Sequence, residues 1–222
     1  MTKHLLNLPV VLAAVFCLAA CVVITAVAFQ PGPTKLLDGE PIPAPDFAVT
    51  DHAGNTVTRA DLLGEVWVCD FFLTRCTGVC PLLGQSMSDL AQELQTTRAL
   101  RDVKLISFSV DPEHDRPDVL ADYRASWKPT WSRGSDARWG AIESRWRHTT
   151  AEDQQAFWQT VTGGFKLTVG PSADPDAEGT PISHSSKLVL VDRAGNIRGY
   201  YDGLNPDDMA ALVADLKRVV AE

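Results

Sequence analysis

The chain has 222 residues, 45% of them hydrophobic, and a formal net charge of −8. This length allows one domain with a sizeable core plus an appendage, and the acidic balance, with no basic cluster in the sequence, excludes a nucleic-acid-binding protein. Five cysteines are too few for a disulfide scaffold, whereas the close pair Cys76 and Cys80 indicates a redox or metal site.

The N-terminal 29 residues predict a membrane anchor. Residues 1–7 form a short leader, and residues 8–29 are apolar and uncharged, which is long enough to cross a bilayer core of ~30 Å as a helix. Lys3 precedes this run, and Lys35, Asp38 and Glu40 follow it. The positive-inside rule therefore predicts a single-pass protein of the cell membrane with its soluble domain on the extracytoplasmic, periplasmic side.

The alternative is a lipoprotein that is cleaved and acylated at Cys21, because residues 18–21 resemble a lipobox. The apolar run continues beyond Cys21, whereas a cleaved signal usually gives way to polar sequence. This continuation favours the uncleaved anchor.

Residues 30–45 carry five prolines and two glycines, a composition that predicts a semi-rigid, extended linker. The folded domain is then expected at residues 46–222. It opens with a predicted β-hairpin, in which residues 46–50 and 56–58 are strands around a turn at 51–55.

The stretch from residue 65 to residue 81 is the centre of the predicted site. Residues 65–72 are rich in β-branched and aromatic residues, as expected of a buried strand, and Cys76 and Cys80 follow them. Pro81 suits the first position of a helix and disfavours a helical conformation at Cys80, which is expected at the boundary. Both sulfurs then lie near a helix N-terminus, where partial positive charge stabilises thiolate over thiol.

Helical and strand patterns alternate downstream. The strand expected at 103–110 delivers Asp111 and Asp115 into a loop at its C-terminal end, where functional loops of open α/β sheets lie. The other expected elements are helices at 82–100, 117–127 and 152–163, a flexible acidic loop at 170–181, strands at 186–193 and 197–201, and a last helix capped by Asn205. The alternation indicates an α/β fold.

A polar stretch at about residues 128–147 contains Trp131, Trp139 and Trp146, and Trp127 comes just before it. These aromatic side chains are expected to pack locally and to cover part of the sheet. The alternative is an exposed partner-binding surface, where tryptophans often anchor contacts.

The order of these motifs resembles the Sco/SenC family of membrane-anchored, thioredoxin-like copper proteins. The resemblance rests on Cys76-x-x-x-Cys80-Pro81 between strand and helix, and on the segments 109–115, 182–185 and 188–195. It runs from about residue 45 to the C-terminus. It implies a thioredoxin-like α/β sandwich with an N-terminal β-hairpin and a C-terminal hairpin plus helix, from which the stretch at 128–147 departs as an insertion.

The resemblance also implies a copper site made by Cys76, Cys80 and His184, with His184 in a loop before the strand at 186–193. Two soft thiolates and one imidazole suit three-coordinate copper(I). Asp111 and Asp115 are expected outside the ligand set, where they orient the site or attract the cation. Alternatively, Asp111 only closes its strand and Asp115 caps the following helix.

The remaining candidates lack such support. His52, His114 and His148 have no comparable motif around them, and Cys69, inside the strand at 65–72, is expected to be a small core residue.

The expected function is that of a copper chaperone, a metal carrier rather than an enzyme, and the resemblance points to the copper centre of cytochrome c oxidase as the acceptor. The alternative is a membrane-tethered thiol–disulfide oxidoreductase in which Cys76 and Cys80 act on the cysteines of a partner. The two are compatible, because a target's thiols must be reduced before they are metallated. A peroxidase is disfavoured, because peroxiredoxins place threonine where Leu73 stands.

Overall fold

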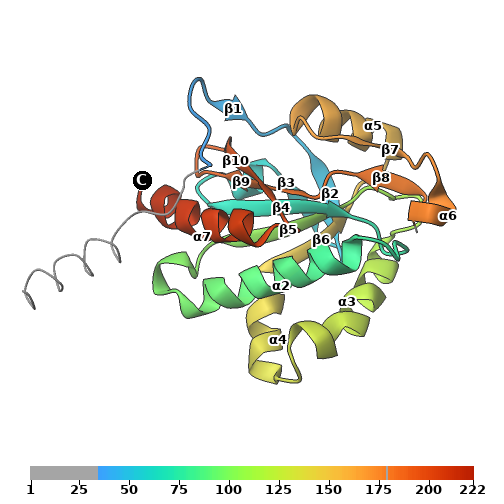
Figure 1. Ribbon diagram of the computed structural model, residues 1–222, viewed down its shortest axis with the longest axis horizontal. Helices are drawn as coiled ribbons and strands as arrows, with labels where there is room; N and C mark the ends of the chain where they lie inside the picture. The colour runs from blue at the N-terminus through green and yellow to red at the C-terminus, as the bar shows by residue number, and fades with distance from the viewer. Residues whose placement is uncertain (1–34, 179) are drawn as a thin grey trace, which may run out of the picture. The chain divides into compact units, whose positions relative to one another are not determined.

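A sheet of eight strands, in the order β1-β10-β9-β4-β5-β6-β2-β3, forms the centre of the computed structural model (Figure 1). The structure describes residues 35–178 and 180–222. The strands are β1 (Ile42–Pro43), β2 (Ala48–Asp51), β3 (Thr56–Thr58), β4 (Trp67–Phe72), β5 (Lys104–Ser109), β6 (Trp146–Thr150), β9 (Lys187–Val191) and β10 (Asn196–Asp202). A second sheet pairs β7 (Val169–Pro171) with β8 (Ile182–His184).

Helices cover both faces of the large sheet. They are α2 (Cys80–Thr96), α3 (Pro117–Trp131), α4 (Asp136–Glu143), α5 (Gln154–Gln159), α6 (Pro175–Glu178) and α7 (Pro206–Ala221), with a π-helical turn, Thr160–Gly164, after α5. In Figure 1, α2, α3, α4 and α7 lie on one face and α5 lies on the other. The predicted α/β class is confirmed.

The neighbouring strands β4, β5 and β6 run parallel, so their C-terminal ends meet at one edge of the sheet. Phe72 and Ser109, the last residues of β4 and β5, are paired in the register. All six residues of β4 are buried, because the strand lies between β5 and β9 with both faces covered. The cysteine loop after β4 and the Asp111 loop after β5 therefore begin side by side.

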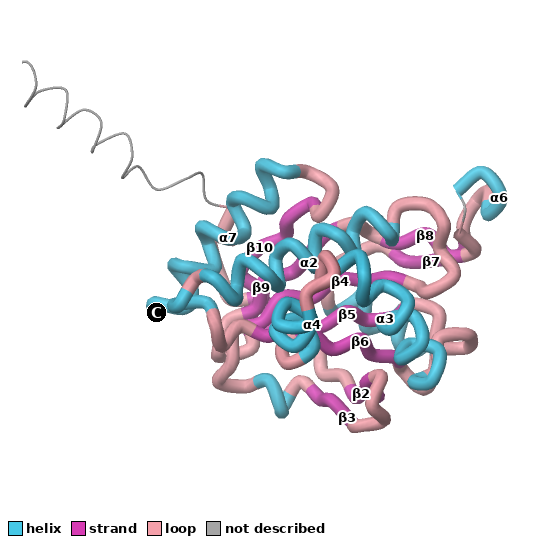
Figure 2. The backbone as a smooth tube through the Cα atoms, turned by 90° about the horizontal axis from the view of Figure 1, so that it is seen from below, coloured by secondary structure: helices cyan, strands magenta, loops and turns pink. Residues whose placement is uncertain are grey.

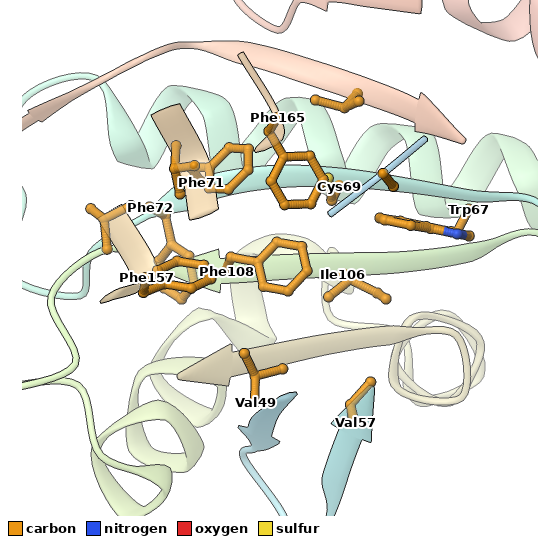
Figure 3. Close-up of a cluster of buried hydrophobic side chains, with 14 of the residues drawn as sticks. Val49, Val57, Trp67, Cys69, Phe71, Phe72, Ile106, Phe108, Phe157 and Phe165 are labelled. Atoms are coloured by element: carbon orange, nitrogen blue, oxygen red, sulfur yellow. The ribbon is translucent and has the colours of Figure 1, made fainter. Parts of the chain in front are cut away.

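An aromatic core packs against the α5 face of the sheet, as Figure 3 shows. Phe71 stacks on Phe108 with ring centroids 5.7 Å apart and meets Phe165 edge to face at 5.3 Å. Cys69 is fully buried in this cluster, so its prediction as a core residue is confirmed. This packing fixes the position of β4, the strand that leads into the loop carrying Cys76.

The tryptophans of the stretch at 128–147 contribute to the core on the opposite face. Trp131 and Trp146 are fully buried there, with ring centroids 4.6 Å apart. Helix α3 continues to Trp131, beyond its predicted end at residue 127, although Pro129 lies in its last turn. Burial of the Trp131 ring offsets the cost of a proline near the helix end. The prediction of local packing is confirmed for Trp131 and Trp146.

Residues 35–45 belong to the folded unit, which corrects the expected boundary at residue 46. The Lys35 ammonium pairs with Asp208 at 2.5 Å, and β1 extends the sheet by pairing with β10. Prolines suit such an edge strand, where a missing N–H can face solvent. The described part of the predicted linker is therefore packed on the domain, with Ile42–Pro43 as an edge strand.

The predicted leader and anchor, together with the start of the linker, lie outside the described residues. Within residues 35–178 and 180–222, no helix combines the length and the apolar character needed to cross a membrane.

Two further segments test the predicted boundaries. The last helix begins as expected, with the Asn205 side chain accepting a hydrogen bond from the N–H of Asp207 at 2.9 Å and Pro206 in the first turn. Residues 170–181, expected as a flexible loop, instead contain the end of β7 and the short helix α6. Pairing between β7 and β8 orders this segment.

Candidate metal centre

The two cysteines lie where β4 passes into α2. Cys76 is in the connecting loop, and its N–H donates to the Leu73 carbonyl at 3.4 Å. Cys80 is the first residue of α2 and Pro81 the second, so the helix begins one residue earlier than expected. The described cysteines, Cys69, Cys76 and Cys80, are free thiols.

His184 reaches the cysteines from the end of β8. It was expected in a loop, but strand pairing with Val169 places it in the two-stranded sheet. Its Nδ1 lies 3.1 Å from the Ser185 carbonyl oxygen, which can only accept a hydrogen bond, so Nδ1 carries the proton. The lone pair of Nε2 then faces the Cys80 sulfur at 3.2 Å.

The two thiols differ in acidity. Hydrogen bonds from the Cys80 thiol and from the main-chain N–H groups of Cys80 and Gly78 lower the pKa of Cys76 to about 5. Donation to Cys76 and burial both raise the pKa of Cys80. Burial also lowers the pKa of His184, which keeps its imidazole neutral. At neutral pH the site therefore holds one thiolate, one thiol and one neutral imidazole.

A surface depression of about 270 Å³ gives access to these groups. Cys76 and His184 line it together with Val79, Thr180, Ile182 and Ser183. Cys80 is only 2% exposed and lies below the opening. A ligand entering the depression therefore meets Cys76 and His184 before it reaches Cys80.

Asp111 and Asp115 hold the cysteine loop through its neighbouring residues. The Arg75 guanidinium donates to the Asp111 carboxylate at 2.6 Å. Asp115 accepts hydrogen bonds from both the N–H and the hydroxyl of Thr74. No contact in the described part of the chain joins either carboxylate to a sulfur, so they act on the site through the loop.

The helix-capping alternative for Asp115 is wrong. Arg116 occupies the cap position of α3, and no side chain caps that end. Thr74 and Arg75, which bind the two aspartates, were not singled out in the sequence. Their partners lie 41 and 36 residues away, and only the sheet register brings them together.

A third residue missed from the sequence is Asp70, on β4. It is 2% exposed and accepts a hydrogen bond from the Ser107 hydroxyl, which in turn accepts one from the Trp146 indole at 2.7 Å. Burial raises the pKa of Asp70 to about 7, and its charge contributes to the raised pKa of Cys80. An aspartate inside an apolar strand was the available sequence signal.

The other histidines have different surroundings. His148 is buried and accepts a hydrogen bond from Arg124 at 2.7 Å, and burial holds its pKa well below the ordinary value. The ring of His52 meets that of His148 edge to face. His114 donates from Nδ1 to Asp115 at 2.9 Å.

Together, the parallel strands, the dithiol at the start of α2 and the facing imidazole define a thioredoxin-like α/β protein with a soft-metal or redox site. The chain belongs to the SCO1/SenC family, whose model matches residues 38–221. The family resemblance in the sequence is thereby confirmed.

Individual relatives agree with this assignment. The SCO1 protein homolog of Bacillus subtilis (strain 168) is 29% identical over 171 residues, which are 77% of this chain and 79% of that protein. The structure of BsSco, a member of the Sco family of cytochrome c oxidase assembly proteins with a disulfide switch, is 26% identical. It aligns over 83% of this chain and 96% of its own, with a TM-score of 0.65. Bradyrhizobium japonicum ScoI with copper bound is 25% identical over 79% of this chain and 98% of its own, with a TM-score of 0.58.

Proposed function

We propose that this protein is a copper chaperone that binds copper at Cys76, Cys80 and His184. It delivers the copper to a copper enzyme, and the acceptor is the copper centre of cytochrome c oxidase. The observation that carries the proposal is the 3.2 Å approach of the Cys80 sulfur to the unprotonated Nε2 of His184. Copper-bound ScoI and the oxidase-assembly role of the BsSco family support the choice of metal and acceptor.

The donor set fits a soft metal. Thiolate and imidazole ligands lie ~2.0–2.3 Å from a first-row ion such as zinc, so two ligands of one ion are about 3–4 Å apart. The observed 3.2 Å between Cys80 and His184 is already in this range. The hydrogen bond from Nδ1 to Ser185 fixes the ring orientation, as is usual for metal-binding histidines.

Copper(I) uptake then has a defined proton balance. Cys76 is already a thiolate at neutral pH, whereas Cys80 must release its proton when its sulfur binds the ion. One copper(I) ion therefore replaces one proton and leaves two thiolates and a neutral imidazole around the cargo.

Thiol–disulfide exchange is the second candidate, and it is favoured by the position of Cys76, which lines the surface depression whereas Cys80 does not. The Cys76 thiolate would attack a partner's disulfide and form a mixed disulfide, releasing one partner thiolate. Cys80, after losing its proton, would then attack Cys76 and release the second partner thiolate, so the partner is reduced and the pair is oxidised. The disulfide switch of BsSco is consistent with such chemistry.

Copper titration of the purified chain, reduced and oxidised, tests the metal site. We expect one copper per reduced chain after desalting and none in the Cys76–Cys80 disulfide form. The Cys76→Ala, Cys80→Ala double variant must lose this copper, and retention of it with the same spectrum would place the site elsewhere. A shortened chain must keep residues 35–45, because β1 pairs with β10.

Anchoring through residues 8–29, with the domain on the extracytoplasmic side, is part of the proposal and is supported by the sequence alone. Membrane extraction followed by intact-mass measurement should give an unprocessed N-terminus. A mature chain that starts at an acylated Cys21 would establish the lipoprotein alternative instead.

A further inference from the structure

Exposed apolar side chains collect beside the cysteine site. Among the described residues, five large hydrophobic side chains are exposed, and three of them are Val79 (44%), Leu82 (63%) and Leu204 (41%). Val79 and Leu82 lie at the first turn of α2. Leu204 follows Gly203, which packs so closely on Leu83 of α2 that an added Cβ would lie 2.2 Å from that side chain. Leu204 therefore lies beside the first turn of α2, where Val79 and Leu82 are exposed.

A groove continues from this patch between α2 and α7, which lie side by side on the same face of the sheet (Figure 2). It has a volume of about 530 Å³. Its lining residues are Ser86, Asp89, Leu90, Glu93, Gly203, Leu204, Pro206, Met209, Ala210 and Val213. The walls are thus apolar, with polar groups along the α2 side.

The groove and the metal site share one face of α2. Val79, Leu82, Ser86 and Leu90 are spaced three, four and four residues apart, which places them on one side of a helix. Val79 also lines the depression that contains Cys76 and His184. From Val79 to Glu93 this face is ~21 Å long, so a segment lying along it would end at the copper-binding residues.

The charge of the groove indicates what fits it. Its two charged lining residues, Asp89 and Glu93, are both negative. Asp89 pairs with Arg133 at 2.7 Å, but both side chains are more than half exposed, so solvent weakens that pair. The groove therefore favours apolar side chains next to lysine or arginine and disfavours an acidic segment.

We propose that this groove docks a segment of the copper-accepting protein that combines apolar and basic side chains. The identity of the partner rests on the proposed function, whereas the chemistry of the docking segment follows from the groove itself. Helices with such a face commonly bind hydrophobic grooves of other proteins. Docking here would hold the acceptor's metal ligands next to Cys76.

The methionines of this chain give a direct assay. Of the three, Met209 lines the groove and Met87 is fully buried in the core, so Met87 serves as an internal reference. The full chain, labelled with ¹³C at its methionine methyl groups, is titrated with a synthetic leucine–lysine helix of about 14 residues, which matches the length of the α2 face from Val79 to Glu93. A leucine–glutamate peptide of the same pattern is the charge control.

We expect the Met209 signal to shift saturably with the leucine–lysine peptide while the Met87 signal stays constant. Leu82→Ser combined with Leu204→Ser should weaken this binding about tenfold, because it removes apolar contacts without adding charge. Leu63→Ser, at a leucine that is 49% exposed outside the groove, should leave it unchanged. An unshifted Met209 signal, equal binding of both peptides, or equal loss with Leu63→Ser would overturn the proposal.

Copper delivery separates this proposal from the proposed function. The Leu82→Ser, Leu204→Ser variant should bind one copper as the parent chain does but transfer it about tenfold more slowly to the copper-centre domain of cytochrome c oxidase. Transfer at the parent rate would overturn the docking role. If the parent chain binds no copper, the proposed function fails, but the peptide titration still tests whether the groove binds an apolar and basic segment.

Self-association is a separate outcome. If the Met209 signal shifts with protein concentration in the absence of peptide, and sedimentation gives the mass of a dimer, the groove binds a second copy of this chain. This result would overturn the partner assignment.

Discussion

The Asp115 carboxylate binds both hydrogen-bond donors of Thr74, accepting from its main-chain N–H at 3.0 Å and from its hydroxyl at 2.5 Å. Ser109, at the end of β5, donates to the same carboxylate at 2.6 Å. Asp115 is fully buried, and Thr74 lies two residues before Cys76. The C-terminal end of β5 and the loop after it therefore fix the start of the cysteine loop, which follows the neighbouring parallel strand β4.

Asp115→Asn should weaken both the fold and the metal site. The amide keeps one oxygen and places an NH₂ group against the donors of Thr74, Ser109 and His114, so we expect a loss of about 2 kcal/mol in the free energy of unfolding. Urea unfolding and copper competition with a chelator measure the two effects. Asp118→Asn, at a side chain that is 71% exposed, is the matched control, and an equal effect of both changes would contradict this role.

The three proposed ligands should contribute unequally to copper binding. Cys76→Ala or Cys80→Ala should abolish tight binding, because copper(I) would keep only one soft ligand. His184→Ala should weaken binding less and impair transfer, since two thiolates can hold copper(I) linearly. Copper content after desalting and transfer kinetics check this order. Cys69→Ala should leave the stoichiometry at one, and a loss of copper there would mean that the wrong cysteines were assigned.

Copper affinity should depend on pH in two stages. Above a pH of about 5 the Cys76 thiol is ionised, so binding releases the Cys80 proton alone and the affinity for copper(I) rises about tenfold per pH unit. Below that value Cys76 must also lose a proton, and the slope doubles. Chelator competition between pH 4 and pH 8 measures the slopes. A slope of two protons across the whole range would show that the pKa of Cys76 is not lowered.

Asp70 should make the copper-free protein less stable as the pH rises. The unfolded chain releases this proton near the ordinary aspartate pKa of 3.8, whereas the folded chain keeps it up to a pH of about 7. Between these values the unfolded state binds fewer protons, so the free energy of unfolding falls by up to ~1.4 kcal/mol per pH unit.

Asp70→Asn should remove this component, because the amide cannot ionise. Urea unfolding of the reduced, copper-free chain between pH 4 and pH 8 compares the two slopes. Asp207→Asn, at an exposed position of α7, is the control and should keep the slope of the parent chain. An unchanged slope in Asp70→Asn would mean that another group titrates.

Trp131→Ala should cost about 3–5 kcal/mol of stability, because it empties a fully buried site between Trp127 and Trp146. Trp139→Ala should cost much less, since that ring is partly exposed and lies below Arg124. Thermal unfolding measures both. An intact fold with failed copper transfer in Trp139→Ala would support the alternative of a partner-binding surface for that residue.

Local sequence signals determined the elements that flank the site. A β-branched and aromatic run predicted β4, and Pro81 located the start of α2 to within one residue, because helix starts depend on side chains within one turn. Asn205 and Pro206 predicted the last helix for the same reason. The cysteine pair itself is visible in the sequence, since its two members lie four positions apart.

Tertiary structure decided how the site is assembled and which groups ionise. Cys80 and His184 are separated by 104 positions, and only the pairing of β7 with β8 sets their distance. The same kind of long-range pairing added residues 42–43 to the sheet, although their prolines predicted a linker. The split between the pKa values of Cys76 and Cys80 follows from the hydrogen bond between their side chains and from the burial of Cys80. The raised pKa of Asp70 follows from burial. Burial is set by packing between segments far apart in the chain, so no local pattern of residues reports it.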